Sequence, residues 1–103
     1  MIFPWLTRPE YYILRGREPV PVSLLVWARW FERSPERMIA KTQVGDARVS
    51  TVFLGLDHSF GGGPPQIFET MIFGGPADGE MWRCATYDEA EDQHCTAIEK
   101  ARG

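Results

Sequence analysis

Short apolar runs separated by turn residues recur along most of the chain, and they predict a sheet of several strands. Val, Ile, Thr, Phe and Tyr are common in these runs, and such side chains favour extended backbone. The runs cover residues 11–14, 19–22, 38–44, 47–56, 67–73 and 80–85. Two prolines in the run at 19–22 cannot donate ladder hydrogen bonds, so this run is an edge strand or no strand. Short turns such as Gly45-Asp46 predict mostly antiparallel pairing.

Two other segments place apolar side chains at every third or fourth position, which predicts amphipathic helices. The first follows Ser23, a helix-capping residue, and ends at Ser34-Pro35 because proline lacks the amide that the next turn uses. Its apolar face holds Leu24, Trp27, Ala28 and Phe31, and Trp30 is expected at the exposed flank of that face. The second opens at Thr86, which forms a capping-box sequence with Glu89. Its apolar stripe comprises Ala90, His94, Ala97, Ile98 and Ala101.

These elements predict an α+β fold: a mostly antiparallel sheet of about four to six strands, with the two amphipathic helices packed on one face. The chain has 103 residues, enough for one hydrophobic core and too few for two. Residues 1–10 contain two prolines and no periodicity, so we expect an irregular N-terminal arm. The single domain is predicted to occupy residues 11–103.

The charge is unevenly distributed along the chain. The net charge is −3, which gives no reason to expect direct binding to nucleic acid. Residues 1–50 carry eight basic and five acidic side chains, whereas residues 51–103 carry three basic and nine acidic ones. We interpret this asymmetry as two halves that face each other in the fold; a contact between two copies, such as a homodimer, is the alternative.

Cysteine content and hydropathy favour a cytoplasmic protein. Cys84 and Cys95 form no CxxC pair, and two cysteines are too few for a disulfide scaffold. The apolar start of the chain is interrupted by Pro4 and lacks the basic beginning of a signal peptide. No stretch approaches the roughly 18 apolar residues of a membrane span, so no membrane association is expected.

The first candidate for chemistry is the segment after the run at 47–56. Asp57 and His58 lie there beside three consecutive glycines, and loops that leave strands often carry function. A histidine near a carboxylate can act as a general base at neutral pH. The interpretation we favour is a polar turn in which Asp57 binds loop amides. The sequence Asp57-His58-Ser59 is not a catalytic triad, because triads are assembled from separate segments.

Glu69 and His94 are the other titratable candidates. Glu69 interrupts an apolar strand, so it lies either on a solvent-facing side of the sheet, which we favour, or buried with a partner. His94 lies on the apolar stripe of the last helix, where a packed histidine bonded to a carbonyl is more common than a catalytic one. His58, Cys84, His94 and Cys95 lack the paired spacing of a zinc site, so neither metal nor cofactor is expected.

A combination of short motifs runs from Tyr11 to Ala101 and covers nearly all the chain beyond the arm. The motifs are Tyr12-Ile13-Leu14, Pro19-Val20-Pro21, Trp27-Ala28-Arg29-Trp30-Phe31-Glu32, Val49 to His58, Gly63-Pro64-Pro65, Phe68-Glu69-Thr70-Met71, Phe73-Gly74-Gly75, Ala90-Glu91 and His94. With them the chain resembles a family of small, mostly uncharacterised proteins encoded by bacteriophages and prophages. Cys84 and Cys95 depart from that family's pattern. The resemblance implies a bacterial host cytoplasm and no particular activity.

Together these observations predict a non-enzymatic phage accessory protein that binds a host or phage macromolecule, with a host protein as the expected partner. Inhibition of a host defence system is one function of this class. The candidate contact residues are Trp5, Arg29, Trp30, Arg33, Glu91 and Asp92, because Tyr, Trp and Arg anchor interfaces and the acidic side chains form an exposed helix face. One alternative is a small enzyme or ligand-binding protein that uses Asp57, His58, Glu69 and His94. Another is a phage structural or assembly component.

Overall fold

The structure, a computed structural model, describes residues 10–57, 59 and 63–103. Within these residues it contains six strands, two α-helices and one short 3-10 helix. In chain order they are β1 (Tyr11–Arg15), β2 (Glu18–Val22), α2 (Leu24–Arg33), η1 (Pro35–Arg37), β3 (Met38–Val44), β4 (Ala47–Phe53), β5 (Phe68–Phe73), β6 (Met81–Cys84) and α3 (Tyr87–Arg102). The predicted α+β class with antiparallel pairing is confirmed.

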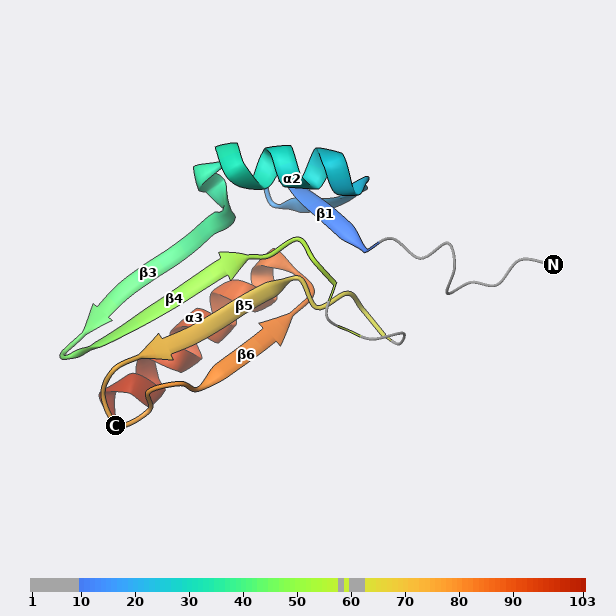
Figure 1. Cartoon of the computed structure of the whole chain (residues 1–103). Coiled ribbons are helices and arrows are strands. Elements are labelled where there is room, and N and C mark those ends of the chain that lie inside the picture. Colours follow the sequence, from blue (N-terminus) through green and yellow to red (C-terminus); the bar gives the residue numbers. More distant parts are fainter. Residues whose placement is uncertain (1–9, 58, 60–62) are drawn as a thin grey trace.

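The strands form two sheets, a division that the sequence did not predict (Figure 1). Strands β3, β4, β5 and β6 pair in that order, each antiparallel to its neighbour. Strands β1 and β2 form a separate hairpin, attached to the larger sheet where the Tyr12 amide donates to the Gly55 carbonyl at 2.7 Å. Pro19 and Pro21 lie in β2 and have no amide to donate, which agrees with its place at a sheet edge.

Helix α3 covers one face of the four-stranded sheet (Figure 1). It begins at the predicted capping box: the Glu89 amide donates to Thr86 Oγ1 and the Thr86 amide donates to Glu89 Oε1, each at 3.1 Å. The side chains that α3 buries are Ala90, His94, Ala97 and Ala101. Three of these four are alanines, so the helix can approach closely over the buried residues of β4 and β5.

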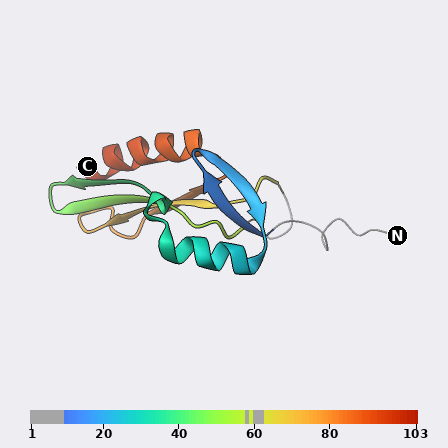
Figure 2. The same ribbon diagram turned by 90° about the horizontal axis from the view of Figure 1, so that it is seen from above.

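Helix α2 packs against β1 and lies on the opposite side of the molecule from α3 (Figure 2). The two helices therefore do not share one face, because the hairpin gives α2 its own packing surface. Trp27 Nε1 donates to the Leu54 carbonyl at 3.0 Å. The Trp30 ring packs edge-on against Phe53, with centroids 5.5 Å apart, so Trp30 is half-buried rather than exposed as expected.

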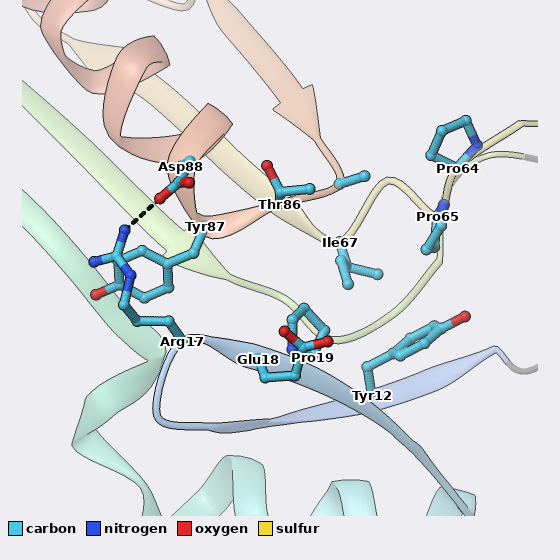
Figure 3. A pocket seen from close by; sticks show the side chains of 11 residues that line it. Tyr12, Arg17, Glu18, Pro19, Pro64, Pro65, Ile67, Thr86, Tyr87 and Asp88 are labelled. Carbon is cyan, nitrogen blue, oxygen red and sulfur yellow. Dashed lines mark hydrogen bonds and ion pairs between the residues drawn. The ribbon is translucent and has the colours of Figure 1, made fainter.

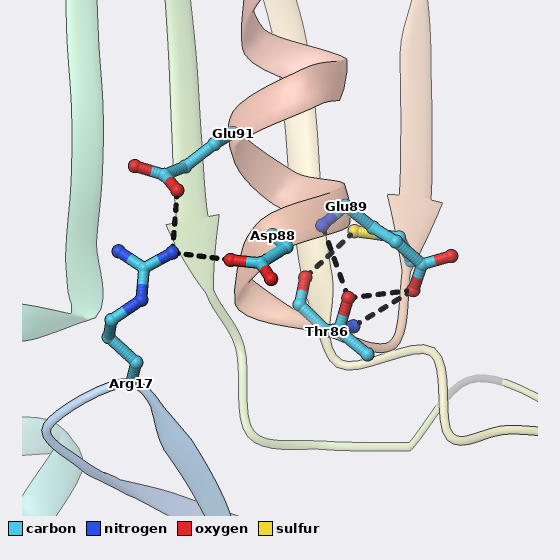
Figure 4. A network of polar contacts seen from close by, with 6 residues as sticks. Arg17, Thr86, Asp88, Glu89 and Glu91 are labelled. Carbon is cyan, nitrogen blue, oxygen red and sulfur yellow. Dashed lines mark hydrogen bonds and ion pairs between the residues drawn. The ribbon is translucent and has the colours of Figure 1, made fainter.

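The positive and negative halves of the chain meet at Arg17, in the turn between β1 and β2. Its Nη2 atom lies 2.6 Å from Asp88 Oδ1 and 2.6 Å from Glu91 Oε1, both on α3 (Figure 4). The guanidinium also lies 4.1 Å from the centre of the Tyr87 ring. These ion pairs join the two oppositely charged halves of the chain at this one turn.

Candidate functional site

The four-stranded sheet has a second face, opposite α3, that no helix of the described residues covers (Figure 1). We call it the open face. The strand register arranges its side chains in three rows, because residues paired across antiparallel strands point to the same side. The rows are Met38, Val52, Glu69 and Arg83; then Lys41, Ser50, Met71 and Met81; then Gln43, Arg48 and Phe73.

Large apolar side chains on the open face remain in contact with solvent. The exposed fractions are 43% for Met38, 41% for Phe73 and 41% for Met81. Val52 and Met71 lie between them and are half-buried. Single exposed apolar side chains are ordinary on protein surfaces, whereas a group gathered on one face is typical of an interaction surface.

Each of the three rows also contains one cation. Arg83 Nε lies 3.1 Å from Glu69 Oε2, so the only carboxylate in the three rows already has a partner. The Arg48 guanidinium lies 4.9 Å from the centre of the Phe73 ring. Lys41 and Arg48 make no ion pair with any other described residue. Glu69 thus lies on the uncovered sheet face, as favoured, but its side chain is only 18% exposed and has the kind of partner that the alternative required.

His94 projects from α3 toward the other face of the sheet and is 6% exposed. Its Nδ1 atom lies 2.7 Å from Thr51 Oγ1 and its Nε2 atom 2.9 Å from Thr42 Oγ1. The Thr51 hydroxyl also lies 2.7 Å from that of Thr70. Burial lowers the pKa of His94 below its usual value, because the charged form loses hydration.

The hydrogen bonds of His94 make it a packed residue, as the favoured interpretation expected, although its partners are hydroxyls rather than a carbonyl. Both ring nitrogens are occupied by threonines, Thr42 on β3 and Thr51 on β4, and Thr70 on β5 contacts Thr51. We call these four side chains, His94, Thr42, Thr51 and Thr70, the threonine–histidine network. The sequence analysis did not identify the threonines. Their inward positions follow from strand alternation, but their meeting with His94 depends on strand register.

Asp57 organises the turn after β4. Its Oδ1 atom accepts from the amides of Ser59 at 2.8 Å and Gln66 at 3.0 Å, and its Oδ2 atom accepts from the Ser59 hydroxyl at 3.0 Å. This is the polar turn that the sequence favoured. His58, its predicted catalytic neighbour, lies outside the described residues.

The described members of the predicted catalytic set occupy three different places. Asp57 lies in the turn after β4, Glu69 points to the open face, and the His94 side chain is buried between α3 and the sheet. The sheet itself separates Glu69 from His94, so these two side chains cannot act on the same substrate atom. A proton transfer requires hydrogen-bond reach or one bridging water.

A pocket of about 450 Å³ lies between the β1–β2 hairpin, the loop before β5 and the first turn of α3 (Figure 3). Its walls include Tyr12, Pro19, Pro65 and Tyr87. The cation that lines it, Arg17, is already held by two carboxylates, and its hydrogen bond to Glu91, followed by that to Asp88, raises its pKa further. Arg17 therefore has little attraction left for an anionic ligand. The sequence did not indicate this pocket, because its lining comes from separate segments.

The predicted contact residues are dispersed over the surface. Arg29 and Arg33 are exposed on α2, and Asp92 is exposed on α3. Glu91 is exposed but engaged with Arg17. Trp5 lies outside the described residues.

Within residues 10–57, 59 and 63–103, no group of three or more His, Cys, Asp or Glu side chains gathers in a way that could hold a metal ion. Neither described α-helix is both long and apolar enough to cross a membrane. In comparisons with known proteins, no family model, no curated protein and no solved structure matches the chain.

Proposed function

We propose that this protein acts by binding another protein through the open face of its four-stranded sheet. The observation that carries the proposal is the gathering of Met38, Phe73 and Met81 on one face, each with more than a third of its surface exposed. Removing apolar area from water contributes roughly 25 cal/mol per Å², so a partner that covers these side chains gains binding free energy.

A flat sheet face suits a protein partner better than a small substrate. Small-molecule sites are usually concave and enclose most of the ligand, and the open face is built from strands that lie side by side. The side chains offered for catalysis are distributed over the two faces and a loop, with Glu69 and His94 on opposite sides. This arrangement favours surface binding over the alternative of a small enzyme that uses Asp57, Glu69 and His94.

The resemblance to phage and prophage proteins supports a partner inside a bacterial cell. We therefore propose a phage accessory protein whose partner is a host or phage protein; inhibition of a host defence protein is one form that this function can take. A structural or assembly role remains the second candidate, because the same open face could join copies of the chain. Rings or filaments of the purified protein in electron micrographs would favour that candidate.

The test is capture from a bacterial lysate with matched surface variants. Phe73→Glu places a charge in the open face, and Thr96→Glu places one on the exposed side of α3. We expect the unmodified chain and Thr96→Glu to retain the same protein, and Phe73→Glu to lose it. Hydrogen exchange of the purified complex should then show protection in β4 and β5. Equal retention by Phe73→Glu, or protection confined to other elements, would contradict the proposal.

A further inference from the structure

We infer that the segment that docks on the open face is acidic as well as apolar. This inference rests on the proposed binding function and adds the chemistry of the partner. In the three rows of the open face, cations outnumber carboxylates by three to one: Lys41, Arg48 and Arg83 against Glu69. The chain as a whole has a net charge of −3, so this surface runs against the charge of the molecule.

The cations are distributed over the open face, one in each row. Lys41 lies on the edge strand β3 and Arg83 on the opposite edge strand β6, while Arg48 lies on β4 beside Phe73. Each cation therefore lies in the same row as at least one large apolar side chain. A partner that places apolar side chains over Met38, Phe73 and Met81 would bring its neighbouring side chains to these cations, and carboxylates are the groups they attract.

Arg48 is the cation best placed to bind an incoming carboxylate. It has no ion-pair partner among the described residues, and its position over Phe73 leaves its planar donors at the edge of an apolar contact. Arginine binds carboxylates through two parallel hydrogen bonds, and such bonds are shorter and stronger than neutral ones. Two neighbouring residues of the partner, one with a carboxylate and the next with an apolar side chain, could therefore contact Arg48 and Phe73 together.

Single-stranded nucleic acid fits the open face less well. Binding of that kind depends on aromatic rings that stack with successive bases, and Phe73 is the one aromatic side chain in the three rows. The other large side chains are Met38, Met71 and Met81. Methionines are flexible and adapt to the apolar side chains of protein partners.

Two surfaces of a second copy, its own open face and its helix α3, also fit less well. Two open faces packed together would place their cations opposite one another, and like charges across an interface oppose binding. The outward side chains of α3 carry the opposite charge, but they are short or charged: Asp88, Glu91, Asp92, Cys95, Thr96 and Glu99 are exposed there. That helix surface offers nothing large to cover Phe73 and Met81.

Fluorescence anisotropy with three probes tests the inference on the full chain. The first probe is a labelled peptide of about 16 residues, because β3 and β4 span roughly 23 Å and a helix rises 1.5 Å per residue. It carries leucines at helical spacing and glutamates elsewhere. The second replaces every glutamate with lysine, and the third is a single-stranded oligothymidylate. We expect the glutamate peptide to bind at least about tenfold more tightly than either other probe, with an affinity that falls as salt rises.

Matched charge reversals locate the binding. Lys41→Glu/Arg48→Glu alters the open face, and Arg29→Glu/Arg33→Glu makes the same change of charge on α2, with circular dichroism to show that both variants fold. We expect the first pair to weaken binding of the glutamate peptide about tenfold or more and the second to change it less than about twofold. Equal weakening by both pairs, or tighter binding of oligothymidylate, would overturn the inference.

The outcomes separate this inference from the proposed function. If the lysine peptide binds best and Phe73→Glu abolishes that binding, the open face binds proteins but the acidic partner is wrong. If Phe73→Glu changes the affinity for neither peptide, the proposed function fails as well. Sedimentation of the protein alone gives its self-association, and a dimer lost in Phe73→Glu would assign the face to a second copy instead.

Discussion

Nδ1 of His94 lies 2.7 Å from Thr51 Oγ1, although the two residues are 43 positions apart in the chain. The contact joins the middle of α3 to the middle of β4. Because the Thr51 hydroxyl also lies 2.7 Å from that of Thr70, the contact extends to β5. A buried polar group without a partner costs free energy, so this network favours one placement of α3 over others on an otherwise apolar face.

Thr51→Val should destabilise the protein more than Thr70→Val. Valine keeps the shape of threonine, but at position 51 it removes two hydrogen bonds and leaves His94 Nδ1 without this partner. We expect a loss of about 1–3 kcal/mol for Thr51→Val and about 0.5–1.5 kcal/mol for Thr70→Val, measured by urea denaturation. Ser50→Ala, on the open side of the same strand, is the control and should have little effect. A larger loss of stability for Thr70→Val than for Thr51→Val would contradict the central place of Thr51 in the network.

The free energy of unfolding should fall as the pH drops below about 6.5. Burial lowers the pKa of His94 in the folded protein, so below that pH the unfolded chain binds more protons than the folded one. The stabilisation by neutral His94 is fully present above the pKa that this histidine has in the unfolded chain. It is lost as the pH falls toward the lower pKa that His94 has in the folded protein. Urea denaturation between about pH 7.5 and 5.5 measures it before most carboxylates titrate. His94→Gln should have a smaller slope over that range; an unchanged slope would exclude His94 as the cause.

Local patterns were sufficient to predict most elements of the fold. The capping box at Thr86 places the start of α3 correctly, because its hydrogen bonds join residues three positions apart. The separate hairpin was not predictable in this way. The separation of the hairpin from the larger sheet depends on the turn of the chain at Gly55, after β4. The Gly55 carbonyl accepts a hydrogen bond from the Tyr12 amide of the hairpin. That contact joins residues far apart in the sequence.

The candidate sites were predicted less well for the same reason. Alternation within β5 placed Glu69 and the inward residues on opposite faces, but it gave no information about which face α3 would cover. The three rows of the open face exist only through the register of four strands. Trp30 was expected at the exposed flank of α2, and its burial against Phe53 follows from the attachment of α2 to the hairpin.

Gly55→Ala should destabilise the protein far more than Gly16→Ala. Both glycines have positive φ, 70° and 62°, where an alanine costs about 1–2 kcal/mol. A Cβ at Gly55 would also lie against the Tyr12 carbonyl oxygen and 2.6 Å from Trp27 Nε1, whereas one at Gly16 meets no atom within 4 Å. Such overlap adds roughly 1–3 kcal/mol. Thermal unfolding followed by circular dichroism gives the comparison, and equal losses would show that the close approach of β1 and α2 does not restrict this position.

The two cysteines should differ strongly in reactivity. Cys84 is 5% exposed, and burial, with a smaller contribution from Glu89, raises the pKa of its thiol to about 11. The thiolate is the reactive form, so Cys84 should remain unlabelled in the folded protein at about pH 8, while the exposed Cys95 reacts readily. Labelling with a chromogenic disulfide reagent should give one rapid equivalent in the native protein and two in urea. Cys95→Ser should abolish the rapidly labelled thiol. If one thiol of this variant is still labelled rapidly, the packing of Tyr87 and Ala90 around Cys84 opens readily.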